Sequence, residues 1–479
     1  MEQRSIFLNL SPLDHRYYLS NKVLFDRLAD CLSEQASVRY AVRCEVALLR
    51  AHLDLHFAES ERPGLHAVLD QLESKISPEE VYEEEEKTQH NIRALVNVIK
   101  RHLPEPLVPF VHLGATSVDM LDTANALKIR DAVQTVVLPV FMELESSLIQ
   151  LVRKEAKTPQ IGRTHGQFAV PITVGFALAE YVSRLGKSIG EILRLSGQLR
   201  GKFAGAVGAY NATSVMTSDP QSLERRVLSY VGLEPSEHST QLVEPEYLLR
   251  LLLEINVAFG IVANLADDLR NLQRSEIGEL KELFTATQVG SSTMPQKRNP
   301  WNSEHVKSLW KAFAPRVMTF FLDQISEHQR DLTNSASGRF VTEYLAGVVA
   351  AVARMGKVVS TLSVDKDRLQ KNLKEGAGDL VLAESVYILL SLAGEPEGHE
   401  VVRVLTLECE KEKKPLIDAL KARPAVWKTL SSELLKRTGW DAETFFSHPE
   451  LYHGQAPQKA MELADRYEQS LKRWKEELA

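Results

Sequence analysis

Apolar residues recur every three or four positions over long stretches of this chain, which is the spacing of one face of an α-helix. The segment 248–272 carries the longest such stripe, at Leu248, Leu251, Leu252, Ile255, Phe259, Ile261, Leu265 and Leu269. The segments 176–203 and 344–362 repeat the pattern, with small residues between the large ones. We therefore predict extended helices in all three segments, with positions at which neighbouring helices approach closely.

The spacing of proline gives the same result, because proline ends or kinks a helix. Three long intervals hold no proline: Pro171 to Pro220, Pro245 to Pro295 and Pro315 to Pro396. The sequence shows no series of alternating strands with hairpin turns and no internal repeat. These observations predict an all-α fold built around a bundle of very long helices.

Breaks in the pattern divide the chain into three helical domains. "FVHLGATS" precedes the first long helix, and "STLSVDKDRL" contains a helix end followed by a new N-terminal cap. We predict an N-terminal domain at 1–114, a central bundle at 115–362 and a C-terminal domain at 363–479. Apolar residues on several faces of the central helices also indicate association between subunits.

Composition excludes several classes of function. The chain has 479 residues, a net charge of -7 and a pI of about 6.1, so it lacks the basic surplus of a nucleic-acid-binding protein. Its three cysteines, Cys31, Cys44 and Cys409, lie far apart and predict neither a metal site nor a disulfide framework. We expect no signal peptide, no membrane span and a cytoplasmic location. The four carboxylates of 83–86 are interpreted as a solvated helix face.

The segment "GSSTMPQKRNP", residues 290–300, is unlike its helical surroundings. It cannot be a phosphate loop of the GxxxxGK[ST] type, because that spacing is absent and no strand precedes it. A plain connector and a catalytic loop both remain possible interpretations. In a catalytic loop the serines would reach the substrate, while Lys297 and Asn299 would stabilise a developing anion. A helix is predicted to start after Pro300 and to add its N-terminal dipole.

Three further polar segments interrupt the apolar pattern. "FVHLGATS" offers His112, and then Thr116 and Ser117 where a helix begins; the alternative is an ordinary helix cap. "GRTHGQ" places His165 between glycines, where it is either presented to a ligand or structural. "QRDLTNSASGRF" holds two arginines and a serine that suit a phosphate or a carboxylate, or form a solvated turn.

Together, "HLGATS", "GRTHGQ" and "GSSTMPQKRNP" make the chain resemble the fumarase/aspartase superfamily, in which the last segment is the signature loop. Within it the chain is most similar to the adenylosuccinate lyase family. "SPLDHRY" matches that family's phosphate-binding Arg-Tyr pair at Arg16 and Tyr17. "GAVGAYNA" and "STQLVEPEY" match as well, and Gln241 falls on a substrate-binding glutamine. "QRDLTNSASGR" matches at Arg330, Ser335 and Arg339.

The resemblance has departures as well as matches. The chain reads "TSVD" where argininosuccinate lyases carry an "SRND"-like motif and fumarases and aspartases carry "SSND". Gln296 is a feature shared with argininosuccinate lyases. In "KTQHNIRAL", Asn91 replaces the aspartate that usually follows His90, which keeps hydrogen bonding but loses a charge. This exchange bears on the substrate more than on the type of reaction.

The resemblance implies an anti β-elimination that releases fumarate from adenylosuccinate, giving AMP, and from succinylaminoimidazole carboxamide ribotide. It implies Ser291 as the base, activated by Lys297, and His165 as the general acid, paired with Glu304 and assisted by His90. The substrate-binding residues that it implies are Arg16, Tyr17, Asn91, His112, Thr116, Ser117, Thr164, Gln241, Ser292, Met294, Asn299, Arg330, Ser335 and Arg339. No metal or other cofactor is expected.

The resemblance also implies a homotetramer with a twenty-helix core, in which each active site takes residues from three subunits. The expected partner is a small nucleotide substrate, with no nucleic acid and no membrane. Two alternatives stay open: a lyase for another succinyl-amine or a modified purine, and a lyase-fold protein that has become a non-catalytic binding or structural module.

Overall fold

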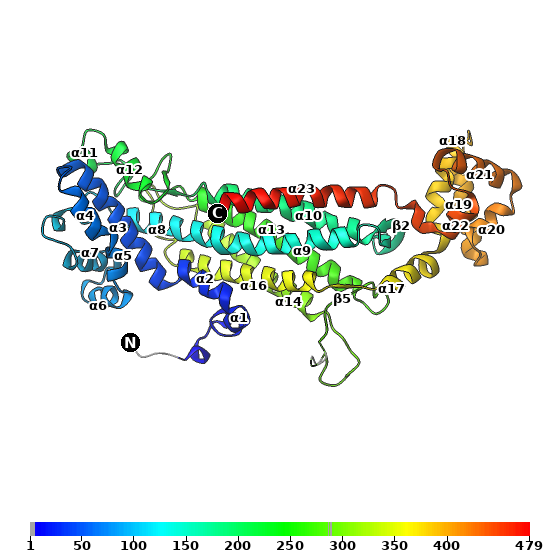
Figure 1. The fold of residues 1–479 in the computed structure, drawn as a ribbon, viewed down its shortest axis with the longest axis horizontal. Coiled ribbons are helices and arrows are strands. Elements are labelled where there is room, and N and C mark those ends of the chain that lie inside the picture. The colour runs from blue at the N-terminus through cyan, green and yellow to red at the C-terminus, as the bar shows by residue number, and fades with distance from the viewer. Residues whose placement is uncertain (1–4, 286, 288–289) are drawn as a thin grey trace.

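The computed structural model describes residues 5–285, 287 and 290–479, which form an elongated and mostly helical molecule (Figure 1). A bundle of long helices occupies the middle. Shorter helices from the beginning of the chain lie at one end of this bundle, and those from the C-terminal part lie at the other. The predicted all-α fold is therefore confirmed.

Long helices that lie side by side form the bundle. They are α8 (Ser117–Ala132), η4 (Val133–Val137), α9 (Leu138–Lys154), α10 (Val174–Ser196), α13 (Glu246–Leu272), α14 (Trp301–Phe313), α16 (Val341–Ser360) and α23 (Ala456–Leu478). Their buried apolar faces belong to one continuous hydrophobic core. Shorter elements connect them: α11 (Thr213–Met216), α12 (Pro220–Ser229), η5 (Ala314–Arg316), α15 (Val317–Leu322) and η6 (Ser337–Phe340).

The segments α8, η4 and α9 form one helix of 38 residues, Ser117–Lys154. This helix continues through Pro139, which lacks an amide proton and would break a regular α-helix. The chain accommodates the proline with a π-helical segment at Val133–Val137, directly before it. At 1.5 Å per residue the helix is about 57 Å long.

Glycines allow close contacts between helices, as predicted from the small residues in the stripes. A Cβ atom at Gly186 of α10 would lie 2.2 Å from the ring of Tyr467 on α23. A Cβ atom at Gly347 of α16 would lie 2.5 Å from the ring of Phe313 on α14. Real contacts are never this short, so these helix pairs depend on glycine at the two positions.

The two ends of the molecule consist of shorter helices. The N-terminal part of the chain first forms η1 (Ile6–Leu8), η2 (Pro12–Asp14), α1 (Arg16–Ser20) and α2 (Lys22–Leu32), of which α1 and α2 lie beside the bundle (Figure 1). The N-terminal end of the molecule contains α3 (Glu34–His56), α4 (Arg62–Asp70), α5 (Leu72–Lys75), α6 (Pro78–Thr88), α7 (Asn91–Arg101) and η3 (Val108–Phe110). The C-terminal end contains α17 (Lys366–Lys371), η7 (Asn372–Ala377), η8 (Gly378–Leu382), α18 (Ala383–Leu392), α19 (Gly398–Glu412), α20 (Leu416–Lys421), α21 (Pro424–Thr438), α22 (Ala442–Ser447) and η9 (Pro449–Tyr452).

The C-terminal segment 363–479 has two parts. Residues from Leu382 to Phe446 bury apolar side chains in a hydrophobic core of their own. Helix α23 then runs back along the bundle, where Tyr467 and Trp474 join the main core (Figure 1). The last helix of the chain therefore stabilises the bundle from which the small C-terminal core projects.

Within the described residues, three small sheets interrupt the helices, although we predicted no hairpins. Strands β1 (Pro159–Thr164) and β2 (Gln167–Thr173) form an antiparallel hairpin. Strands β3 (Arg200–Gly201) and β4 (Glu234–Pro235) pair in parallel, and β5 (Leu280–Lys281) and β6 (Ser363–Val364) pair antiparallel. The hairpin contains the "GRTHGQ" segment. The central region, which we predicted as a bundle of long helices, therefore also contains strands.

The structure does not contradict the expected absence of a membrane span, but it corrects the interpretation of one charged segment. The helices Ser117–Lys154 and Glu246–Leu272 are long and apolar enough to cross a membrane, but 67% and 56% of their apolar windows are buried inside the bundle, as in core helices. In the carboxylate run 83–86, Glu84 is not solvated. It is buried and bonded to Asn97 and Arg101, and these hydrogen bonds lower its pKa to about 2.

Candidate active site

The candidate residues from the sequence lie in three groups. One group is at the N-terminal end of the bundle and includes the segments around His112, Gln241 and Arg330. A second surrounds the loop 290–300, and a third is the tip of the β1–β2 hairpin with Thr164 and His165. Each group has its own supporting contacts.

The first group is built on the N-terminus of α8. The Asp119 carboxylate accepts a 2.7 Å hydrogen bond from the backbone N–H of Thr116, which fixes the chain as it enters the helix. Ser117 occupies the first turn and is half-buried. The predicted helix start is therefore confirmed, and its free N–H groups and hydroxyl can bind an anion.

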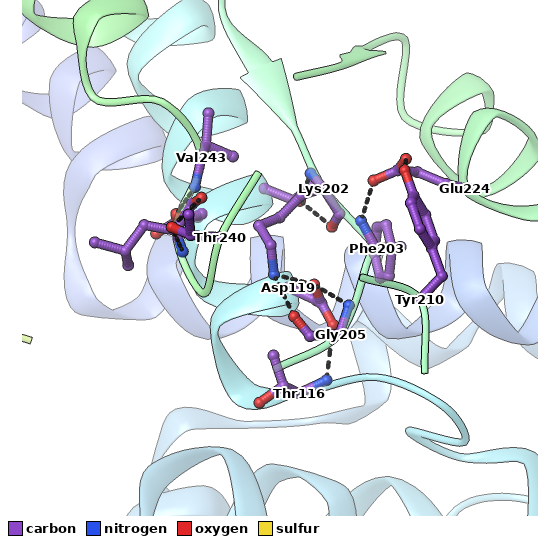
Figure 2. A network of polar contacts seen from close by, with 12 residues as sticks. Thr116, Asp119, Lys202, Phe203, Gly205, Tyr210, Glu224, Thr240 and Val243 are labelled. Carbon is purple, nitrogen blue, oxygen red and sulfur yellow. Dashed lines mark hydrogen bonds and ion pairs between the residues drawn. The ribbon is translucent and has the colours of Figure 1, made fainter. Parts of the chain in front are cut away.

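A buried ion pair lies directly behind this helix start (Figure 2). Lys202 and Asp119 are both 0% exposed, and the Lys202 ammonium donates to the Asp119 carboxylate and to the Gly205 carbonyl. The Gly205 amide also donates to Asp119, at 3.3 Å. The network thus joins α8 to the segment "GKFAGAVGAY", which begins at the last residue of β3.

A second carboxylate extends the same network. Glu224 of α12 accepts hydrogen bonds from the backbone N–H of Phe203, at 2.8 Å, and from the hydroxyl of Tyr210 (Figure 2). Burial raises the pKa of Glu224 above its ordinary value, although both hydrogen bonds oppose this change. The loop between Lys202 and Tyr210 is therefore held at both ends by buried polar contacts.

One turn further along α8, Asp122 holds the segment that contains Gln241. Its carboxylate accepts a 2.8 Å hydrogen bond from the Val243 amide, and burial raises its pKa to about 6. The Gln241 amide donates to the Gln329 carbonyl at 3.2 Å, next to Arg330. The structure thus brings Gln241 and Arg330 to the end of the bundle that holds Thr116. Asp122 also lines a cavity of about 120 Å³, together with Arg200, Glu244, Asp323, Asn334 and Gly338.

The remaining residues of the first group lie on nearby loops. His90 is the N-cap of α7, and its Nδ1 accepts a 3.3 Å hydrogen bond from the Arg93 amide. Asn91 is exposed, and its side-chain oxygen accepts from the Ile92 amide at 2.7 Å. Ser335 and Arg339 are exposed on the segment that leads into α16.

The second group centres on the loop 290–300, which projects from the bundle (Figure 1). The Ser291 hydroxyl oxygen accepts hydrogen bonds from the backbone N–H groups of Thr293, at 3.3 Å, and Met294, at 3.0 Å. Asn299 donates from its side-chain amide to the Gly290 carbonyl at 3.0 Å, which closes the loop at its base. Ser292, Met294 and Lys297 are exposed.

This loop forms one wall of a cavity of about 640 Å³. Met294, Lys297, Asn299 and Glu304 line it, together with Arg270 from the end of α13 and Arg274 just beyond that helix. Helix α14 begins beside it at Trp301, as predicted, and the Glu282 carboxylate accepts hydrogen bonds from the amides of its first turn. The cavity is therefore rich in cations and suits an anionic ligand.

Arg16 and Tyr17 belong to this second group through His305, a residue that sequence reasoning missed. The Tyr17 hydroxyl lies 3.0 Å from His305 Nε2. Burial, Arg354 and Arg16 lower the pKa of His305, which favours a neutral imidazole in this hydrogen bond. His305 directly follows Glu304 in the chain, which was the available signal. Arg354 comes from α16 and no local pattern indicated it.

The third group is the hairpin turn. His165 and Gly166 connect the paired residues Thr164 and Gln167, and both have positive φ, 53° and 75°, as a tight two-residue hairpin turn requires. His165 is exposed, and within the described residues its ring has no hydrogen-bond partner. Arg163 and Gln160 anchor the hairpin by binding the fully buried carboxylate of Glu279.

No single copy of the chain brings the three groups together. His112 precedes the start of the 38-residue helix Ser117–Lys154, and His165 follows its end. The two histidines are therefore separated by about the helix length, roughly 57 Å. Glu304 makes no contact with His165 in the described part of the chain. Within the same residues, no group of three His, Cys, Asp or Glu side chains could hold a metal ion.

Comparisons with known proteins agree over most of the chain. A family model described as Lyase matches residues 27–314, and one described as Adenylosuccinate lyase C-terminal matches residues 326–439. The adenylosuccinate lyase of Pyrococcus horikoshii is 31% identical over 467 residues, covering 96% of this chain and 99% of the relative. That of Pyrococcus abyssi is 32% identical over 431 residues, covering 89% and 92%.

Solved structures share the fold. The 3-carboxy-cis,cis-muconate lactonizing enzyme from Pseudomonas putida superposes with a TM-score of 0.76 at 24% identity, covering 92% of this chain and 97% of the other. A fumarate lyase from Mesorhizobium sp. BNC1 gives a TM-score of 0.77 at 23% identity, with the same coverage. At these identities the likeness describes the architecture alone.

Proposed function

Because this chain belongs to the adenylosuccinate lyase family, we propose that it eliminates fumarate from adenylosuccinate, giving AMP, and from succinylaminoimidazole carboxamide ribotide. The observation that carries the chemistry is the environment of Ser291. Two backbone N–H groups point at its hydroxyl oxygen, and donors of this kind favour a negatively charged oxygen. A serine in water is too weak a base to remove a proton from carbon, so this activation is required.

In the proposed reaction Ser291 removes a proton from the carbon beside a carboxylate of the succinyl group. The electron pair moves first into that carboxylate, and Lys297 and Asn299 stabilise the extra negative charge. The carbon–nitrogen bond then breaks with its electrons going to the nitrogen. His165, paired with Glu304 of another subunit and assisted by His90, donates a proton there, which completes fumarate and the amine product.

The other residues bind the substrate in this proposal. Arg16 and Tyr17, with Arg330, Ser335 and Arg339, bind the phosphate, while Thr116, Ser117 and Ser292 bind a carboxylate. The remaining contacts to the substrate come from Asn91, His112, Thr164, Gln241 and Met294.

We further propose a cytoplasmic homotetramer in which three subunits contribute to each site. The separation of the three groups supports it, because a compact substrate cannot bridge about 57 Å within one chain. Long bundle helices would then pack against those of other copies. The hairpin tip of one subunit would reach the N-terminal end of a second and the loop 290–300 of a third.

Mixing two inactive variants tests the shared site. We expect Ser291→Ala and His165→Ala to be inactive as separate homotetramers. If each position is filled independently from an equal mixture, about a quarter of the sites in mixed tetramers hold both native residues, so about a quarter of the activity returns. Fumarate release from co-expressed variants measures this. Mixed tetramers without recovered activity would place both residues in the same subunit's site.

The substrate is tested directly by incubating the protein with each succinyl compound and measuring fumarate by chromatography. Fumarate from both supports the proposal and shows that Asn91 is tolerated. Fumarate from neither, with a folded tetramer, would transfer the proposal to another succinyl-amine.

Arg339→Ala is expected to raise the KM about tenfold or more with a small change in kcat, because a charge-assisted hydrogen bond to phosphate contributes about 1.5–3 kcal/mol. Arg403→Ala is the matched control, since Arg403 is exposed in the C-terminal end and its side chain pairs, among the described residues, with Glu400. An unchanged KM in Arg339→Ala would mean that the phosphate binds elsewhere.

A further inference from the structure

His112 lies in a turn that two side chains of one helix hold in place. It has a positive φ of 63°, which is rare for a residue other than glycine. The Glu45 carboxylate of α3 accepts a 2.7 Å hydrogen bond from His112 Nδ1. Two turns along the same helix, His52 lies with its Nε2 3.1 Å from the carbonyl of Leu113. The turn is thus fixed at its side chain and at its backbone.

Glu45 is buried in a way that makes it depend on His112. Its side chain is 0% exposed. Within the described residues its Oε1 binds His112, and its Oε2 is buried with no hydrogen-bond partner. A buried carboxylate with one partner is costly unless that partner is cationic, so the pair favours a protonated imidazole.

The charges around His112 include some that raise its pKa and one that lowers it. Burial alone would lower its pKa, but the hydrogen bond and the charge of Glu45 outweigh this, Asp119 of α8 adds to them, and Arg93 of α7 opposes them. The net result is a pKa above the ordinary value. His52, which is hydrogen bonded to the Leu113 carbonyl, has a pKa lowered by burial, which favours its neutral form.

The hydrogen bond to Glu45 uses Nδ1 and leaves Nε2 for a ligand. The His112 side chain is 20% exposed, while Glu45 behind it is inaccessible. In the same group the helix start at Thr116 and Ser117 offers an anion site. A cationic Nε2–H donor therefore lies at the end of the bundle where the substrate's oxyanions are proposed to bind.

We propose that Glu45 is a positioning residue, which keeps His112 as an oriented imidazolium whose Nε2–H donates to an oxyanion of the bound substrate. This inference rests on the proposed function for the identity of the substrate. The pairing of Glu45 and His112 is independent of it. The oxyanion is either the phosphate or a carboxylate, and the two are distinguished by separate probes.

The direct test is the titration of His112 in the full-length protein. Diethyl pyrocarbonate acylates the neutral imidazole, so the rate of modification of His112 against pH, read by mass spectrometry, gives its midpoint. We expect a midpoint above about 6.5 in the native protein and below it in Glu45→Gln, which keeps the shape and loses the charge. Equal midpoints in the two proteins would overturn the proposal.

Ligand binding supplies the second readout. Calorimetry with AMP alone and with fumarate alone is expected to show about tenfold weaker binding of one of them to Glu45→Gln near pH 7.5. This loss should shrink as the pH falls and His112 becomes protonated without Glu45. Loss with AMP identifies the phosphate, and loss with fumarate identifies a carboxylate. Unchanged binding of both would contradict the role of Glu45.

Glu80→Gln is the matched control. Glu80 binds His102 at 3.0 Å in the same end of the molecule and is not among the candidate site residues. Its removal should leave the His112 midpoint and both affinities unchanged. If Glu45→Gln does not fold, a native His112 midpoint at or below about 6.5 would still refute the proposal. A protein that titrates as expected but releases no fumarate would refute the proposed function alone.

Discussion

Ser291→Ala should lower kcat by about 10²–10⁴-fold, the usual contribution of a general base, while the substrate still binds. The change removes the oxygen that accepts the Thr293 and Met294 amides and leaves the cations of the neighbouring cavity in place. Binding measured by calorimetry should stay near the native affinity. Fumarate release under saturating substrate gives the kcat.

Variants of two other serines, Ser308 and Ser292, make the experiment specific. Ser308→Ala changes an exposed serine on α14 and should have no effect on kcat or KM. Ser292→Ala removes the adjacent hydroxyl and is expected to weaken binding more than turnover. If Ser291→Ala kept native turnover, or if Ser292→Ala alone abolished it, the assignment of the base to Ser291 would be wrong.

Lys202→Met should destabilise the protein by about 3–5 kcal/mol, because removing one partner of a buried ion pair leaves the other charge without compensation. Here the remaining charge would be Asp119, which is fully buried at the first turn of α8. Denaturant unfolding at one fixed protein concentration measures the change, since association in the proposed tetramer would contribute to stability.

The surface lysine Lys187 on α10 provides the comparison. It is exposed, and Lys187→Met should change the unfolding free energy by no more than about 0.5 kcal/mol. Adding Asp119→Asn to Lys202→Met should recover part of the lost stability by removing the unpaired charge. A native unfolding midpoint in Lys202→Met would show that the buried pair contributes little to the fold.

The long helices were predictable because their apolar periodicity is local. Helix α13 follows from its leucine stripe, and the start of α14 follows from Pro300. The hairpin was missed because Pro159, Gly162 and Pro171 read as breaks, whereas pairing with a neighbouring strand overrides such local signals. Pro139 is the opposite case, because a proline predicts a helix break and here the helix continues. The π-helical segment allows this continuation.

The site residues also divide into those that the sequence indicated and those that only the fold brings into place. Ser291, His165 and Ser117 lie in sequence motifs, so the chain itself pointed to them. Glu45 and Lys202 act through contacts with residues far along the chain, 67 and 83 positions away. Their one local signal was a charged side chain on an apolar helix face or in an apolar segment, which has many ordinary explanations.

The helix from Ser117 to Lys154 limits which insertions and deletions the protein can tolerate during evolution. Removing one residue from a regular helix shortens it by about 1.5 Å and rotates everything beyond it by about 100°. In the proposed tetramer, the helix start at Thr116 and Ser117 and the hairpin histidine at the other end would then lose their alignment with neighbouring copies. The helix thus fixes the distance and the relative rotation of its two ends. Insertions are tolerable in the loops beyond these ends but not within the helix. The exception is the π-helical segment, where loss of one residue could be absorbed by a return to regular α-helical winding.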